Sequence, residues 1–195
     1  ISTFSRKSGF SIFLDAVLSY DSLSTILNQQ LAGKEFEMKK FLFKKKFIID
    51  QCKVYGANSE KLIIKINFSG TNEGVVYLLG KPVYNKENRT IEVTDIDFDI
   101  KSKNILLGSA DWLFDKKIIK EISKKAKFDC SAFIDTAKTN INQQLNQEWV
   151  KGIRSYGNIS DIKLIGIYPM QQYLVLRSNC TGDLSVKVES INFSL

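Results

Sequence analysis

The chain has 195 residues, of which 44% are hydrophobic and 25% are charged, and its formal net charge is +7. This balance is typical of a soluble globular protein, and a chain of this length can bury a core without disulfides or metals. Histidine is absent, which excludes Ser-His-Asp and Cys-His nucleophile systems and histidine metal sites. We therefore expect no enzyme, no catalytic residues, no cofactor and no metal site, and only carboxylate or lysine chemistry stays open.

We expect residues 1–195 to form a single domain, because only two prolines occur and no Ser/Gly-rich linker interrupts the chain. The first residue is Ile1 rather than methionine, so the expectation is a fragment of a longer protein or a mature form. No apolar run approaches the roughly 20 residues that a membrane-spanning helix needs. Cys52, Cys130 and Cys180 form neither a CxxC pair nor a zinc pattern, and we expect small buried thiols.

The first predicted elements are a strand followed by a helix. Phe10–Tyr20 alternates between apolar and polar residues, which predicts a half-buried strand. Asp21 or Ser22 is then expected to cap a helix that ends at Gly33. The apolar stripe of this helix is expected to comprise Leu23, Ile26, Leu27 and Leu31.

From Lys34 to Lys101 the sequence predicts antiparallel strands joined by tight turns, with Leu62–Phe68 as a strand of clear alternation. Turns are expected at Gly70–Gly74 and at Asn85–Asn88. The apolar face of the next strand changes from odd to even numbers near Thr94, which predicts a β-bulge there. A similar change of face separates Leu184, Val186 and Val188 from Ile191, Phe193 and Leu195.

Two helices are expected next, over Ser109–Lys127 and Cys130–Val150. The chain then closes with strands at Ile162–Ile167, Gln172–Arg177 and Asp183–Phe193. Strands follow strands through short turns without regular βαβ alternation, which favours an α+β fold with an antiparallel sheet.

A short sequence occurs twice. Asn28–Leu31 and Asn142–Leu145 both read Asn-Gln-Gln-Leu, and similar Lys-to-Gly runs ending at Gly56 and Gly166 follow them. The similarity is either an internal repeat of a helix with its strands or chance in a chain rich in these residues. If it is a repeat, the polar triplets are expected on the solvent side of the two helices rather than in a binding site.

Several phrases of the sequence occur in the same order in a known group of proteins. They are Tyr20–Leu23, Leu31–Gly33, Gly74–Tyr84, Ile91–Phe98 and Ala110–Leu113, followed by the long helix ending near Trp149. On these, the chain resembles a bacterial family of uncharacterised envelope proteins related to the tubular lipid-binding (TULIP) superfamily, which includes the bactericidal permeability-increasing protein. The resemblance implies a strongly curved antiparallel sheet wrapped around a long amphipathic helix, with additional shorter helices. It also implies a place in the bacterial cell envelope, periplasmic or membrane-anchored.

The first candidate site is an apolar groove between helices and sheet. Its expected lining comprises Leu23, Leu27, Leu62, Ile64, Ile66, Phe68, Phe133, Ala137, Ile141 and Leu145. A lipid tail would gain about 0.8 kcal/mol per buried methylene in such a groove. The alternative is that these side chains fill one another's space as an ordinary core.

The second candidate site is basic. Lys39, Lys40, Lys44, Lys45 and Lys46 fall within eight residues, with apolar residues between them. Such a cluster suits an anionic membrane surface, or it is a solvated strand edge. Nucleic acid is the weaker option, because no recognised binding motif accompanies the charge.

A third candidate is acidic. Asp95, Asp97 and Asp99 alternate along one strand and offer carboxylates to a hard cation, although a solvent-facing strand edge explains them better.

The leading hypothesis is non-catalytic binding of a hydrophobic ligand, such as a lipid. The alternative is an envelope scaffold or interaction module with a filled core and basic surfaces that face a membrane or a partner. A hydrolase using carboxylates is the third and weakest hypothesis, because strand alternation alone does not bring two carboxylates into a cleft.

Overall fold

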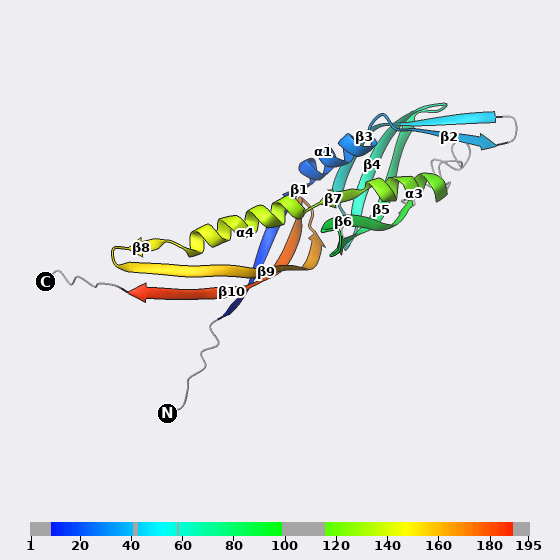
Figure 1. Ribbon diagram of the computed structural model, residues 1–195. Helices are drawn as coiled ribbons and strands as arrows, with labels where there is room; N and C mark the ends of the chain where they lie inside the picture. Colours follow the sequence, from blue (N-terminus) through cyan, green and yellow to red (C-terminus); the bar gives the residue numbers. More distant parts are fainter. Residues whose placement is uncertain (1–8, 41–42, 58, 99–115, 189–195) are drawn as a thin grey trace. The chain divides into compact units, whose positions relative to one another are not determined.

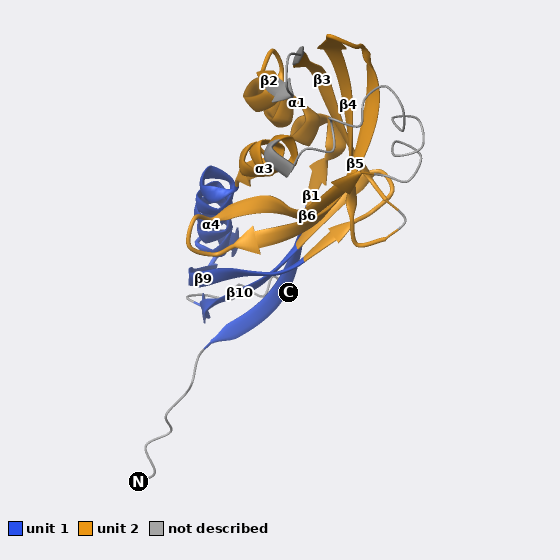
Figure 2. Ribbon diagram, turned by 90° about the vertical axis from the view of Figure 1, so that its right-hand side faces the viewer, with its two compact units in different colours: residues 1–16, 130–166, 177–195 blue, residues 17–129, 167–176 orange. Residues whose placement is uncertain are grey.

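The computed structural model describes residues 9–40, 43–57, 59–98 and 116–188 (Figure 1). The described chain is mostly β, with curled antiparallel sheets and three short helices. It forms two compact units, coloured separately in Figure 2. Unit 1 comprises residues 1–16, 130–166 and 177–195, and unit 2 comprises residues 17–129 and 167–176. The expected single domain over residues 1–195 stays a prediction, which one cooperative unfolding transition would support.

The elements follow one another along the chain as β1 (Phe10–Ser19), α1 (Tyr20–Leu31), β2 (Glu35–Lys40), β3 (Phe43–Gly56), β4 (Leu62–Gly70), β5 (Gly74–Asn85), β6 (Thr90–Phe98), α3 (Lys116–Lys125), β7 (Lys127–Asp129), α4 (Ser131–Leu145), β8 (Glu148–Val150), β9 (Ile153–Pro169) and β10 (Tyr173–Val188). One sheet has the strand order β2-β3-β4-β5-β6-β7, and the other has the order β1-β10-β9-β8.

The core of unit 2 lies between its six-stranded sheet and the helices α1 and α3. Three of the four residues in the predicted stripe of α1 are confirmed, since Leu23, Leu27 and Leu31 are at most 1% exposed, whereas Ile26 is only partly buried. The helix packs against β3, and α3 packs against β6 and α1. At one end of this core the ring of Phe47 lies 5.0 Å from that of Phe68, measured between centroids.

The bulge expected near Thr94 is confirmed. Thr94 pairs with Lys81 and Asp97 with Leu79, so two residues of β6 oppose Gly80 alone. Asp95, one of these two, has a φ of +50°, a left-handed conformation that aspartate tolerates better than most residues. The second predicted change of register, in the chain after Val188, lies outside the described residues.

The start of the first helix was predicted two or three residues too late. α1 begins at Tyr20, and its cap is Ser19, whose Oγ accepts a hydrogen bond from the Ser22 N–H at 3.1 Å. Tyr20 continues the strand alternation in sequence, so its helical position is not visible from periodicity. The predicted end is confirmed, because the chain leaves the helix at Ala32 and Gly33 adopts a φ of +77°.

The long helix predicted over residues 130–150 is wrong at its C-terminal end. α4 stops at Leu145, and Glu148–Val150 forms the strand β8, which pairs with the start of β9. Trp149 and Val150 are good strand formers, and Gly152 turns this hairpin with a φ of +83°. Of the helix predicted over residues 109–127, the described part is α3, while residues 109–115 lie outside the described residues.

Polar side chains join α1 to the backbone of β3. The Asn28 amide donates to the Cys52 carbonyl at 2.7 Å and accepts from the Cys52 N–H at 2.7 Å. Two residues on, the Val54 N–H donates to Ser24 Oγ at 2.9 Å. Asn28 therefore makes the two backbone hydrogen bonds that a neighbouring strand would make with Cys52. Its predicted place on the solvent side of the helix is wrong.

The same order of elements occurs twice. A helix, a short strand, a long strand paired with it and a further strand appear as α1-β2-β3-β4 and again as α4-β8-β9-β10. β3 and β9 begin 110 residues apart, at Phe43 and Ile153, and β4 and β10 begin 111 residues apart, at Leu62 and Tyr173. The two Asn-Gln-Gln-Leu runs both end the helix of this arrangement, which favours an internal repeat over chance.

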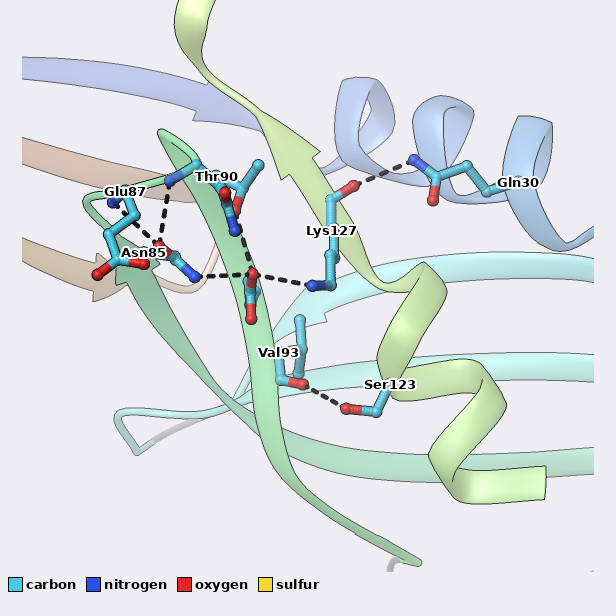
Figure 3. A network of polar contacts seen from close by, with 9 residues as sticks. Gln30, Asn85, Glu87, Thr90, Val93, Ser123 and Lys127 are labelled. Atoms are coloured by element: carbon cyan, nitrogen blue, oxygen red, sulfur yellow. Dashed lines mark hydrogen bonds and ion pairs between the residues drawn. The ribbon is translucent and has the colours of Figure 1, made fainter. Parts of the chain in front are cut away.

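A polar network holds β6 to β7 and α1 (Figure 3). Glu92 Oε1 accepts hydrogen bonds from Lys127 Nζ at 3.0 Å, from Thr90 Oγ1 at 3.2 Å and from Asn85 Nδ2 at 3.3 Å. The Lys127 carbonyl in turn accepts from Gln30 Nε2 of α1 at 3.1 Å. The hydrogen bond from Lys127 is the main cause that lowers the pKa of Glu92 below its ordinary value of 4.5.

Replacing Glu92 by glutamine is expected to destabilise the protein by about 1 kcal/mol at pH 7. Because the pKa of Glu92 is lower in the folded chain than in the unfolded chain, its stabilisation is complete above the unfolded pKa. It is lost as the pH falls through the folded pKa, so the difference between the two proteins should shrink in acid. Urea denaturation at pH 7 and at pH 3 measures both values, and an undiminished difference at pH 3 would contradict this account.

Candidate functional site

The predicted apolar lining divides into two sets. The residues of α1 and β4 belong to unit 2, and each of them is at most 3% exposed: Leu23, Leu27, Leu62, Ile64, Ile66 and Phe68. The four residues of β4 alternate along the strand and face the core, and the two leucines belong to the stripe of α1. All six are buried within unit 2. In unit 2, these residues form a filled core.

The predicted lining residues of α4 belong to unit 1, and they are more exposed than those of unit 2. Phe133 is 47% exposed, and Ala137, Ile141 and Leu145 are only half-buried. No residue of α4 is buried. The apolar stripe of this helix is therefore open, whereas that of α1 is closed.

α4 is held along the edge of β9 by side chains that recur every four residues. The Asn146 amide donates to the Gly157 carbonyl at 2.6 Å and accepts from the Gly157 N–H at 3.2 Å. Asn142 Oδ1 accepts from the Ile159 N–H at 2.6 Å, and Lys138 Nζ donates to the Ser160 carbonyl at 3.2 Å. Asn142 belongs to the second Asn-Gln-Gln-Leu run, so its predicted place on the solvent side is wrong, as it is for Asn28.

This attachment turns the apolar stripe of α4 over one face of the sheet. Ile141 and Leu145 precede Asn142 and Asn146 by one residue, which is about 100° around the helix. At Gly157, an added Cβ would lie 3.1 Å from the Leu145 side chain and 3.1 Å from that of Leu184 on β10. Glycine at this position therefore lets the helix approach the sheet closely.

The sheet of unit 1 continues this face with exposed apolar residues. Leu184, Val186 and Val188 alternate along β10 and are 44–60% exposed. On β1, Phe10 lies on the same side, because an added Cβ at Gly182 would be 3.0 Å from its ring, and Ile12 is 42% exposed. We call this surface the α4 face, defined by Phe10, Ile12, Ile141, Leu145, Leu184, Val186 and Val188.

The opposite side of this sheet carries paired polar side chains, and Phe13 and Tyr156 are exposed there. Arg177 donates two hydrogen bonds to the Asp15 carboxylate, at 2.8 and 2.7 Å, and this pairing lowers the pKa of Asp15. Ser11 donates to Asn179 Oδ1 at 2.8 Å. The opposite side therefore combines polar pairs with exposed aromatic residues, whereas the residues that define the α4 face are all apolar.

The cysteines are buried, as expected. Burial raises the pKa of the Cys52 thiol to about 12. Burial and the charge of Asp161 raise that of Cys180. Both thiols are therefore protonated at neutral pH and act as small apolar groups rather than as nucleophiles.

The lysine cluster lies on the hairpin of β2 and β3. In the backbone register Lys39 is opposite Lys44, and Lys40 is opposite Phe43. Lys46 forms an ion pair of 2.8 Å with Glu35 on the neighbouring strand. The predicted contact of Lys39, Lys40, Lys44, Lys45 and Lys46 with an anionic surface stays a prediction.

The bulge in β6 argues against the acidic candidate site of Asp95, Asp97 and Asp99. It breaks the alternation that would place Asp95 and Asp97 on one face, and Asp99 lies outside the described residues. Within the described ranges, no group of three or more cysteine and carboxylate side chains is placed to hold a metal ion.

Sequence reasoning missed the asparagines that bond to strand backbones. The repeated Asn-Gln-Gln-Leu run contained the signal, but polar residues on a helix are ordinarily solvated. The i, i+4 spacing of Asn142 and Asn146 beside an apolar stripe is the pattern that would have indicated a contact. The spacing alone does not predict which strand these asparagines contact.

Residues 1–188 match the model of a family described as a domain of unknown function, DUF4403. The chain belongs to this family. No curated protein and no solved structure gave a match to this DUF4403 chain. Among the described residues, no helix is both long enough and apolar enough to cross a membrane.

Proposed function

We propose that this DUF4403 protein binds a hydrophobic ligand, such as the acyl chain of a lipid, on the α4 face of unit 1, without catalysis. The observation that carries the proposal is the open stripe of α4. Four apolar positions recur along the helix, yet none is buried by the described chain. The adjoining residues of β10 are also exposed, and exposed apolar residues that adjoin one another mark ligand or partner surfaces.

The chemistry of the α4 face suits an elongated apolar ligand. Leucine, isoleucine, valine and phenylalanine side chains provide burial without directional bonds, and each ligand methylene they cover contributes about 0.8 kcal/mol. A relationship to the TULIP superfamily and a place in the bacterial cell envelope belong to the same proposal. They rest on the resemblance of sequence phrases and on the curled antiparallel sheets.

The test is binding of a fluorescent fatty acid, together with mass spectrometry of lipid extracted from the gently purified protein. Val186→Asp places a carboxylate on the α4 face, which a bound acyl chain would have to desolvate, so affinity should fall about tenfold or more. Val17→Asp is the matched control, because Val17 is 62% exposed and Val186 is 60% exposed. Equal affinity of the two variants, or no binding by the unaltered protein, would reject the proposal.

The filled core of unit 2 favours a second candidate, an interaction module whose surfaces meet a membrane or a protein partner. Residues of α1 and β4 that were predicted to line a groove are at most 3% exposed, so unit 2 offers an apolar ligand little room among them. This candidate predicts a protein purified without lipid that still associates with vesicles or with a partner.

A further inference from the structure

The sheet of unit 2 has a second face, turned away from α1 and α3, which we call the outer face (Figure 2). It carries the residues that alternate with the core of β3, β4 and β5. Its large side chains are partly exposed: Tyr55 is 41% exposed, Val75 38%, Tyr77 37% and Val83 42%. These values describe an apolar and aromatic surface that no described helix covers.

Two lysines lie at the centre of the outer face. Lys53 of β3 is directly opposite Lys65 of β4, and Lys65 is directly opposite Tyr77 of β5. Like charges at directly opposite positions destabilise a sheet. In the described part of the chain, neither lysine has a carboxylate within ion-pair distance. The fold therefore places two lysines at directly opposite positions of the sheet, and no carboxylate of the described residues is paired with either of them.

The neighbouring rows of the outer face are apolar or neutral. Tyr55, Ile63 and Leu79 form the row on one side of the lysines, and Gln51, Asn67 and Val75 form the row on the other. Carboxylates lie toward the margins. Asp50 accepts from Ser69 at 2.7 Å, and Glu60 lies 3.6 Å from Lys81. On β6, Asp97 is directly opposite Leu79 and Glu92 is directly opposite Val83.

We propose that the outer face docks on an anionic membrane surface. Lys53 and Lys65 would contact lipid phosphate groups, and Tyr55, Tyr77, Val75 and Val83 would enter the interface between head groups and acyl chains. Lysine stems and tyrosine rings suit this boundary, because each combines an apolar body with a polar tip. Association of the cations with anionic lipid also relieves the repulsion between the two opposed ammonium groups.

A membrane fits the outer face better than a nucleic acid does. Nucleic-acid surfaces use arginine and stacking aromatic residues along a charged path, and β3, β4 and β5 contain no arginine. The rows beside the two lysines instead carry the aliphatic residues Ile63, Leu79 and Val75, which gain from contact with lipid but not from contact with a phosphodiester backbone. Binding to an oligonucleotide is the competing outcome of the test.

The first experiment is co-sedimentation of the full chain with phosphatidylcholine vesicles, with and without phosphatidylglycerol. Lys53→Gln combined with Lys65→Gln should reduce binding to the anionic vesicles about twenty-fivefold, from roughly fivefold per lysine. Lys86→Gln combined with Lys120→Gln is the matched control, because it removes the same charge from exposed positions off the outer face. Its binding should fall less than about threefold. Circular dichroism confirms that both variants are folded.

Equal losses in the two double variants would overturn the proposal, because binding would then follow net charge alone. Binding to a single-stranded oligonucleotide that depends on Lys53 and Lys65, without binding to anionic vesicles, would overturn it as well. A second measurement reports on the aromatic contact. Tyr55→Trp should add fluorescence that shifts to shorter wavelength with anionic vesicles and not with neutral ones, and an unshifted spectrum would contradict insertion of this face.

Discussion

Phe47→Ala is expected to lower the free energy of unfolding by about 3–5 kcal/mol. The ring is 1% exposed and lies between two other aromatic rings, with centroid distances of 5.0 Å to Phe68 and 5.9 Å to Phe36. Truncation removes the burial of the ring and leaves a cavity beside Phe68 and Phe36. Neighbouring strands are held in place by hydrogen bonds, so the cavity should close only in part.

Urea denaturation followed by circular dichroism measures this loss. Val83→Ala is a suitable control, because Val83 is 42% exposed on β5 and its truncation should cost less than about 1 kcal/mol. A loss below about 1.5 kcal/mol for Phe47→Ala would mean that the aromatic cluster is loosely packed, contrary to its burial.

Asn28→Ala is expected to cost about 2–4 kcal/mol. One amide satisfies both the N–H and the carbonyl of Cys52, at 2.7 Å each. Its removal leaves the N–H and the carbonyl of Cys52 without these partners, and Cys52 is 0% exposed. Each unsatisfied group costs about 1–3 kcal/mol, and the better helix propensity of alanine recovers less than about 1 kcal/mol.

Gln29→Ala tests whether the loss belongs to the hydrogen bonds, since Gln29 is an exposed neighbour on the same helix. It should leave the stability within about 0.5 kcal/mol of the original. Asn142→Ala should cost less than Asn28→Ala, because the bond of Asn142 to β9 is to the Ile159 N–H alone. Equal stabilities of the Asn28 and Gln29 variants would show that α1 does not depend on its contact with the β3 backbone.

Features that depend on local sequence could be predicted. The alternation of Leu62–Phe68 and the stripe of α1 match the buried positions, because burial on one face imposes a period on the sequence. The bulge in β6 was predictable for the same reason, since its apolar face changes from Val93 to Ile96. The turn at Asn85 also follows from local chemistry, because its side chain accepts from the Glu87 and Asn88 N–H groups.

Features that depend on distant contacts could not be predicted. The stripes of α1 and α4 look alike in sequence, but Leu27 is 0% exposed and Phe133 is 47% exposed. Periodicity identifies an apolar face without identifying what covers it. For this reason the predicted lining included both a filled core and an open surface. The outer face was missed because Lys53 and Lys65 become neighbours only through strand pairing.

The asparagines of the two helices have a consequence for solubility. An unpaired strand edge offers a row of N–H and C=O groups on which another chain can extend the sheet, and this is a common start of aggregation. A carboxamide carries the same donor and acceptor as a peptide group, so Asn28 at Cys52 and Asn146 at Gly157 occupy sites where a foreign strand would attach. α1 and α4 thus shield β3 and β9 from misassembly.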